Sequence, residues 1–247
     1  FSKKKGIVMI EVQRHRMLEK VSITQNGVTY YNPPQSIPAD KMEEFILKRV
    51  VSGFRMMSWG VINLPRASGI VQMLIERYRQ CNGRRYHDTT HLYEMVYADF
   101  LTSSISIASI PSLWHDAYMS NLAEPDTGTF DPLLLMGKGE GTDEVISAKM
   151  LGLALTLVGF GDEPGETCEV EYRQMFDAVL FTDHNYDPSR QHTYLSDLVC
   201  DLDLMRLAAR SDQFDDYSKQ ILEEYRVKPE DVEAAMDRRR GVLQKFL

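Results

Sequence analysis

The chain has 247 residues, 43% of them hydrophobic and 26% charged, a composition that excludes a disordered or fibrous protein. This length allows a sizeable buried core, and a formal net charge of −8 argues against a nucleic-acid polymer or an anionic membrane as partner. Three cysteines without a CxxC pair favour a reducing compartment over a disulfide framework. No apolar run approaches the roughly 18 residues of a membrane span. We therefore expect a soluble, cytoplasmic protein.

The first part of the chain carries β-branched and aromatic residues around Asn26 and Gly27. Both turn residues tolerate positive φ, so the pattern predicts a β-hairpin. A proline-rich stretch follows, and helical spacing begins after it. We predict a mainly α-helical protein with a β-hairpin appendage at residues 1–38 and a helical domain at residues 39–247. Exposed hairpin edges often pair with another chain, so residues 20–31 are a candidate surface for a homo-oligomer.

Apolar residues at three- and four-residue spacing recur through the rest of the chain and predict a series of amphipathic helices. One segment, residues 121–143, does not fit this pattern, because glycines and prolines alternate there with acidic residues. A loop of this length is either functional or disordered. It follows a His-Asp pair directly, which would suit a lid.

The stretch RRYHDTTH at residues 84–91 contains the first candidate functional residues. On a helix, His87 and His91 at positions i and i+4 lie on one face. The two side chains could bind one metal ion together, or one could bind the metal while the other donates a proton to a substrate. The alternative is a helix N-terminus with a capping histidine.

Two further segments add carboxylates in apolar surroundings. His115 and Asp116 lie in the segment IPSLWHDAYM, where burial of an unpaired carboxylate is costly and a metal ion would remove the cost. Asp201 and Asp203 lie in VCDLDLMRL. Residues two apart point in different directions on a helix, so only one of these two is expected to bind a metal directly.

Taken in order, these motifs resemble the HD superfamily of metal-dependent phosphohydrolases. The resemblance is narrower to a bacterial branch of predicted HD phosphohydrolases and covers about residues 70–226, through RRYHDTTHLYEMV, LWHDAY, DEVISAKML, VLFTDH, CDLDL and YSKQILEEY. The RRYHDTTH run is also similar to the Y-H-N-x-x-H-A run of cyclic-nucleotide phosphodiesterases. The resemblance implies an all-helical HD-domain bundle.

The resemblance also implies a set of metal ligands: His91, His115, Asp116 and Asp203, with Asp201 as second choice for the last. Such a set suits Mn²⁺, Mg²⁺, Fe²⁺, Co²⁺ or Zn²⁺, and ligand softness does not choose among them. Asp116 could also bridge to a second ion, which His184 and His192 could help to bind.

The remaining roles follow from the same motifs. His87 falls on the position of the general acid that protonates the leaving oxygen, beside the catalytic Asp116. Arg84 falls on an arginine that could bind a substrate phosphate in a bidentate way. Glu144 and His184 are expected to line the pocket.

The sequence departs from the family pattern at several places. Asp88 stands where the family has asparagine, which could change how His87 is oriented. Leu222 stands where an arginine is expected. The segment 121–143 is longer than its family counterpart, and about the first 60 residues have none.

The expected function is hydrolysis of a phosphoester of a nucleotide or similar small molecule by metal-activated water. A second hypothesis is an HD-fold binding module that senses a nucleotide without turnover. A third is oxygen activation by a di-iron pair, which needs His184 and His192 as additional ligands. A chance cluster would leave Asp116, and Asp201 or Asp203, buried without a partner.

Overall fold

The computed structural model describes most of the chain. The described residues are 22–25, 28–34, 37–57, 62–80, 83–102, 107–120, 142–160, 166–183 and 192–243. Several sequence predictions concern residues outside these ranges: residues 1–21 of the predicted appendage, the Asn26-Gly27 turn, the segment 121–141 and His184.

The described residues form helices and one hairpin, so the prediction of a mainly α-helical protein is confirmed. None of these helices has the length and apolar character of a membrane span. The α-helices are α2 (Ala39–Met56), α3 (Leu64–Gln80), α4 (Thr89–Thr102), α5 (Ser109–Trp114), α6 (Asp143–Leu157), α7 (Glu166–Leu180), α8 (Tyr194–Leu204), α9 (Ser211–Glu224) and α10 (Val232–Leu243). Two 3-10 turns, η2 (Met205–Ala208) and η3 (Pro229–Asp231), follow α8 and α9.

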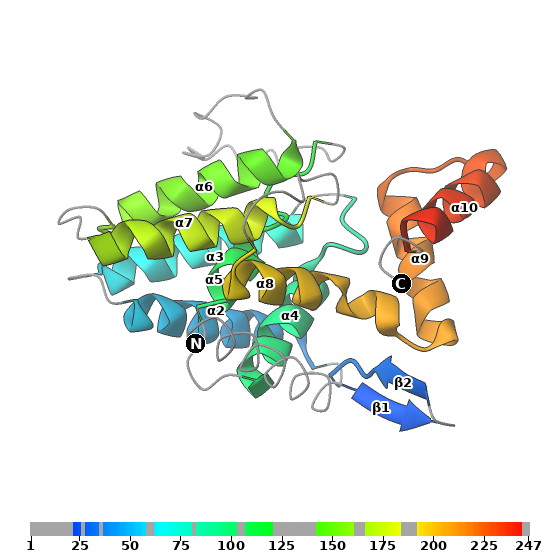
Figure 1. Ribbon diagram of the computed structural model, residues 1–247, viewed down its shortest axis with the longest axis horizontal. Coiled ribbons are helices and arrows are strands. Elements are labelled where there is room, and N and C mark those ends of the chain that lie inside the picture. The colour runs from blue at the N-terminus through cyan, green and yellow to red at the C-terminus, as the bar shows by residue number, and fades with distance from the viewer. Residues whose placement is uncertain are drawn as a thin grey trace, which may run out of the picture.

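The short helix α5 lies at the centre of the bundle (Figure 1). It packs against α2, α4, α6, α7 and α8, and all six of its residues are buried. Trp114, its last residue, meets Phe54 of α2 edge to face, with ring centroids 6.3 Å apart. Because His115 and Asp116 follow α5 directly, this central position of α5 puts their side chains in the interior of the bundle.

The hairpin pairs β1 (Ser22–Gln25) with β2 (Val28–Tyr31) in antiparallel register, as the sequence predicts. It is not separate from the helices. Tyr31 is buried, forms a parallel bridge with Ala209, and donates a hydrogen bond from its hydroxyl to Glu94 of α4 at 3.0 Å. The appendage therefore contacts the helical body through its second strand.

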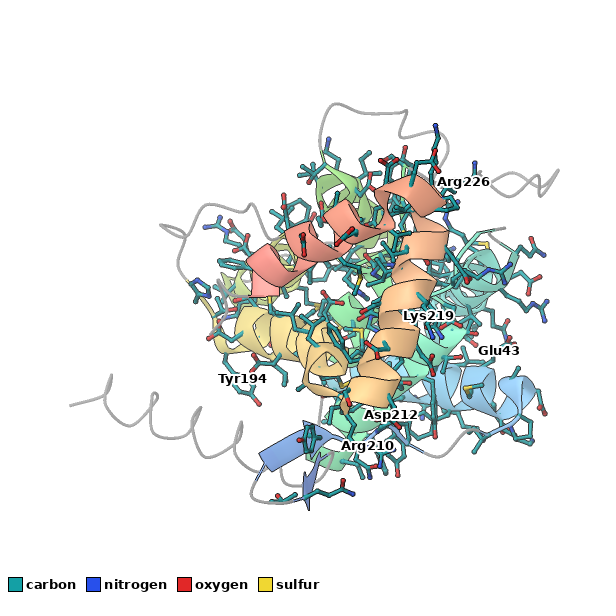
Figure 2. The ribbon with its side chains drawn as sticks, turned by 90° about the vertical axis from the view of Figure 1, so that its right-hand side faces the viewer. Glu43, Tyr194, Arg210, Asp212, Lys219 and Arg226 are labelled. Carbon is teal, nitrogen blue, oxygen red and sulfur yellow. The ribbon has the colours of Figure 1, made fainter. Side chains whose placement is uncertain are left out.

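Helices α9 and α10 lie at one end of the molecule, and Figure 2 shows the charged outer face of α9 with Asp212 and Lys219. Helix α9 ends sharply because Arg226, two residues after its end, adopts a left-handed conformation, with φ of 51°. The amide of Arg226 donates to the carbonyl of Glu223, and that of Val227 to the carbonyl of Leu222. This turn fixes the last residue of α9, Glu224, which is buried against the site described below.

Candidate metal centre

Four side chains from α4, from α8 and from the turn that follows α5 come together in the interior. They are His91, His115, Asp116 and Asp203, and one potential ligand atom of each lies within 4.8 Å of all the others. The structure thus brings together the ligand set that the resemblance implies. Asp201 is not part of this group.

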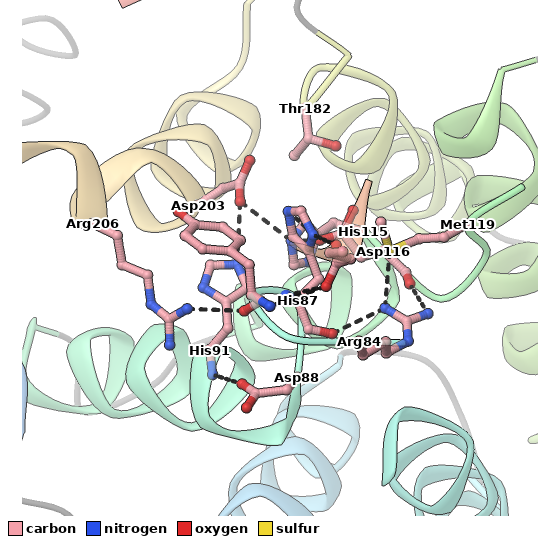
Figure 3. A network of polar contacts seen from close by, with 12 residues as sticks. Arg84, His87, Asp88, His91, His115, Asp116, Met119, Thr182, Asp203 and Arg206 are labelled. Carbon is pink, nitrogen blue, oxygen red and sulfur yellow. Dashed lines mark hydrogen bonds and ion pairs between the residues drawn. The ribbon is translucent and has the colours of Figure 1, made fainter. Parts of the chain in front are cut away.

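The contacts within the group are short and involve the same few atoms (Figure 3). Oδ1 of Asp203 lies 3.3 Å from Nε2 of His91 and 3.4 Å from Nε2 of His115, and Oδ2 of Asp116 lies 2.7 Å from the same nitrogen of His115. The two imidazoles are buried, whereas the carboxylate side chains of Asp116 and Asp203 are 19% and 13% exposed. The group is therefore accessible from its carboxylate side.

The donor atoms fit a divalent cation. Nδ1 of His115 lies 2.7 Å from the carbonyl oxygen of Ser112. A carbonyl only accepts, so Nδ1 carries a proton, and Nε2 is the nitrogen that faces the carboxylates. Nε2 of His115 and Oδ2 of Asp116 are buried, and despite their 2.7 Å separation neither atom has a hydrogen-bond partner of acceptable geometry. Two such converging acceptors are stabilised by a shared cation.

The electrostatics of the group favour ionised carboxylates. Burial raises the pKa of Asp116, but the charges of His115 and His87 outweigh it, so the pKa falls below its usual value. Burial also raises the pKa of Asp203, but its close contacts with Nε2 of His115 and Nε2 of His91 outweigh burial, and the pKa lies well below its usual value. Burial lowers the pKa of His91 to about 3. Burial also lowers the pKa of His115, but the charge of Asp116 and the contacts with Asp116 and Asp203 outweigh burial and raise that pKa well above its usual value. Metal binding requires neutral imidazoles and anionic carboxylates, so a cation would bind here by displacing the proton from Nε2 of His115.

His87 stands beside the group. Its Nε2 lies 3.7 Å from Oδ2 of Asp116, and its Nδ1 donates to Oε1 of Glu224. Burial lowers the pKa of His87, but the charge of Asp116 and the hydrogen bond and charge of Glu224 outweigh that effect and raise it. The ring is thus held with one nitrogen on Glu224 and the other toward the potential metal ligands.

Glu224 also fixes the backbone that carries this ring. Its Oε2 accepts hydrogen bonds from the amides of Arg85, Tyr86 and His87 at 2.8, 3.0 and 3.1 Å. Sequence reasoning assigned no role to Glu224, although it lies in the motif segment YSKQILEEY. An acidic residue on an amphipathic helix has no local signal that distinguishes a buried partner from a solvated one.

Arg84 lies behind the site. Nη2 donates to the carbonyl oxygen of Asp116 at 2.8 Å, Nη1 donates to that of His87 at 3.1 Å, and the guanidinium stacks on Tyr78 at 4.2 Å. Only 7% of the residue is exposed. These contacts favour a structural role, joining the two motif segments, over the phosphate-binding role that the resemblance implies.

The departure at Asp88 has a simple structural reading. Its Oδ1 accepts hydrogen bonds from the amides of Thr90 and His91 at 2.9 and 3.0 Å, at the start of α4. A side-chain oxygen in this position caps a helix N-terminus, and asparagine supplies the same oxygen. The substitution therefore preserves the entry into α4.

The remaining predicted residues lie farther out. Glu144 is half-buried in the first turn of α6, and burial, with smaller effects of the charges of Asp183 and Asp116, raises its pKa. His192 precedes α8, at the opposite end from Asp203, with Nδ1 2.8 Å from Oδ1 of Asp197. The described residues therefore give no support to His192 as a second metal ligand or to the di-iron hypothesis.

Comparisons of the chain with profiles of protein families, with characterised proteins and with solved structures found no match.

Proposed function

We propose that the chain is a metal-dependent phosphohydrolase of the HD type, which hydrolyses a phosphoester of a nucleotide or a similar small molecule. The observation that carries the proposal is the convergence of two imidazole nitrogens and two carboxylates, with His87 beside their accessible side. The donor set suits Mn²⁺, Mg²⁺, Fe²⁺, Co²⁺ and Zn²⁺ alike.

When bound, a divalent ion would supply Lewis acidity, which lowers the pKa of water and polarises a phosphoryl oxygen. His91, His115, Asp116 and Asp203 would hold it.

His87 supplies the proton in this proposal. Because Nδ1 donates to Glu224, the transferable proton of the imidazolium is on Nε2, which faces Asp116. That proton passes to the leaving oxygen of the substrate as the bond from phosphorus to that oxygen breaks, and His87 is left neutral. General acid catalysis of this kind typically contributes about 10²- to 10⁴-fold in rate.

The net charge of the chain and the low exposure of the site residues both favour a small substrate. The net charge of −8 disfavours a polyanionic polymer, whose binding needs many lysines and arginines over a long surface. Little of the site is exposed, because the side chains of Asp116, Asp203 and His87 are each less than one-fifth exposed. A small phosphoester fits these two constraints better.

The test measures product release from a panel of nucleotides, cyclic nucleotides and sugar phosphates with Mn²⁺, Mg²⁺ or Co²⁺ and with EDTA. Asp116→Ala should abolish metal-dependent turnover. Asp212→Ala, which removes an exposed carboxylate from α9, is the matched control and should retain it.

Two other outcomes would count against the proposal. Tight metal binding with a nucleotide-dependent rise in melting temperature, but no turnover, would support the sensing module instead. Absence of metal binding would contradict both readings.

A further inference from the structure

A second buried network lies next to the candidate metal centre, and the two meet where the ring of Tyr86 packs against that of His91. Arg206, only 2% exposed, donates from Nε and Nη2 to the carboxylate of Glu94 at 2.8 and 3.2 Å, and from Nη1 to the carbonyl oxygen of Tyr86 at 2.9 Å. Its guanidinium also lies over the rings of Tyr86 and Tyr217, at 4.9 and 4.6 Å. The hydroxyl of Tyr31 donates to the same Glu94 oxygen that Nε of Arg206 contacts.

Each half of the ion pair lies near a metal ligand in the sequence. Arg206 follows Asp203 by three residues, where α8 passes into η2, and Glu94 follows His91 by three residues on α4. The pair therefore fixes the element that carries Asp203 against the element that carries His91.

The third contact reaches the proton donor. Tyr86, whose carbonyl oxygen accepts from Arg206, directly precedes His87, and its ring packs against the rings of His87 and His91 with centroids 4.7 and 5.4 Å apart. One guanidinium thus joins three segments whose relative placement sets the geometry of the site.

We infer that Arg206 is a positioning residue for the metal centre, and that the N-terminal hairpin, through Tyr31, belongs to the same support. The inference rests on the metal site of the proposed function.

Stability alone does not account for this arrangement. A buried ion pair loses hydration on both partners, and well-packed apolar residues of similar volume often stabilise a core equally well or better. Apolar residues, however, do not fix direction. The planar guanidinium has five donors in rigid geometry, and here it uses them on a carboxylate and a carbonyl from two different segments. The ion pair therefore adds a defined orientation of the segments that it joins.

The test measures the affinity of the metal-free, full-length protein for Co²⁺, by visible absorption in competition with a chelator. Loss of an outer partner of a metal site typically weakens metal binding by about 10- to 100-fold, which is the expectation for Arg206→Lys. Tyr31→Phe keeps the ring and removes one hydrogen bond to Glu94, so we expect a smaller weakening, of about threefold or more.

Two controls separate positioning from general destabilisation. Tyr30→Phe makes the same change on the neighbouring residue, and Val71→Ala makes a cavity in the core on α3. Both should keep Co²⁺ affinity within about twofold, even where Val71→Ala lowers the melting temperature. If Arg206→Lys does not fold, Tyr31→Phe against Tyr30→Phe decides the question.

The inference is overturned if both network variants fold and bind Co²⁺ as the wild type does. The readout needs no turnover, so it is separable from the proposed function. A wild-type protein that binds Co²⁺ but hydrolyses no phosphoester would overturn the phosphohydrolase proposal and leave the positioning role in place.

Discussion

The carboxylate of Glu224 binds the imidazole of His87 and, with its second oxygen, the three backbone amides that lead to that imidazole. One side chain from the last turn of α9 therefore orients the candidate proton donor and, together with Asp116, raises its pKa. Since Glu224 is almost fully buried, its charge is poorly screened by solvent.

The first prediction concerns the pH dependence of turnover in Glu224→Gln. A general acid works below its pKa, and Glu224 contributes to the raised pKa of His87. Removing that charge lowers the pKa, so activity should be lost at a lower pH on the alkaline side, and kcat should fall by about 10- to 100-fold. The measurement is kcat and kcat/KM, each against pH, with Glu223→Gln, a change at the neighbouring exposed residue, as control. An unchanged alkaline limb would remove the role assigned to Glu224.

The second prediction concerns folding stability in acid. Burial raises the pKa of Glu224, but the hydrogen bond and charge of His87 and the backbone amides outweigh burial and lower it from 4.5 to about 2. A carboxyl group with a depressed folded pKa stabilises the fold above its unfolded pKa and loses that contribution as pH falls through the window between the two.

The wild type should therefore lose more stability than Glu224→Gln as pH falls from about 6 to about 3, by on the order of 2 kcal/mol. Urea unfolding in EDTA, at a series of pH values, measures this difference. Glu223→Gln should follow the wild-type curve, and parallel curves for wild type and Glu224→Gln would contradict the prediction.

The third prediction tests the structural reading of Arg84. Arg84→Lys loses the two-pronged contact with the carbonyls of His87 and Asp116 and the stacking on Tyr78. We expect a loss of about 1–3 kcal/mol in the free energy of unfolding. Inhibition by inorganic phosphate should change by less than about threefold, because the guanidinium does not face the substrate in this reading. Unchanged stability with much weaker phosphate inhibition would restore the phosphate-binding role.

The fourth prediction concerns the departure at Asp88. Asparagine and aspartate are similarly effective helix caps, so Asp88→Asn should leave the unfolding free energy within about 0.5 kcal/mol, whereas Asp88→Ala should cost about 1 kcal/mol. Turnover of Asp88→Asn should equal that of the wild type. A marked change in turnover for Asp88→Asn would mean that the charge at this position acts on the site.

Local patterns in the sequence predict a large part of this architecture. The apolar spacing predicts the helices, and Asn26-Gly27 predicts the paired strands on either side. A histidine and an aspartate in an apolar segment indicate a metal site at His115 and Asp116, because such side chains are costly to bury without a shared partner. His91 is indicated by its i, i+4 spacing from His87 and, as a ligand, by the resemblance to the HD superfamily.

The supporting contacts could not be predicted, because they join residues far apart in the chain. Glu224 and His87 are 137 positions apart, and Arg206 and Glu94 are 112 apart. No periodicity or local motif encodes which acidic residue of an amphipathic helix turns inward. The position of Arg84 in the motif likewise does not show that its N–H groups donate to backbone carbonyls.

The choice between Asp201 and Asp203 is the last prediction. The sequence establishes only that two residues at this spacing point in different directions on α8, and the structure puts Asp203 against both imidazoles. Asp203→Asn should weaken Co²⁺ binding by more than the roughly 10- to 100-fold typical of an outer partner, because a direct anionic donor is lost. Asp201→Asn makes the identical chemical change two residues away and should stay within about threefold of the wild type. Equal losses in the two variants would mean that the charge of α8 as a whole, and not ligation by Asp203, attracts the cation; chelator competition on both proteins decides between these cases.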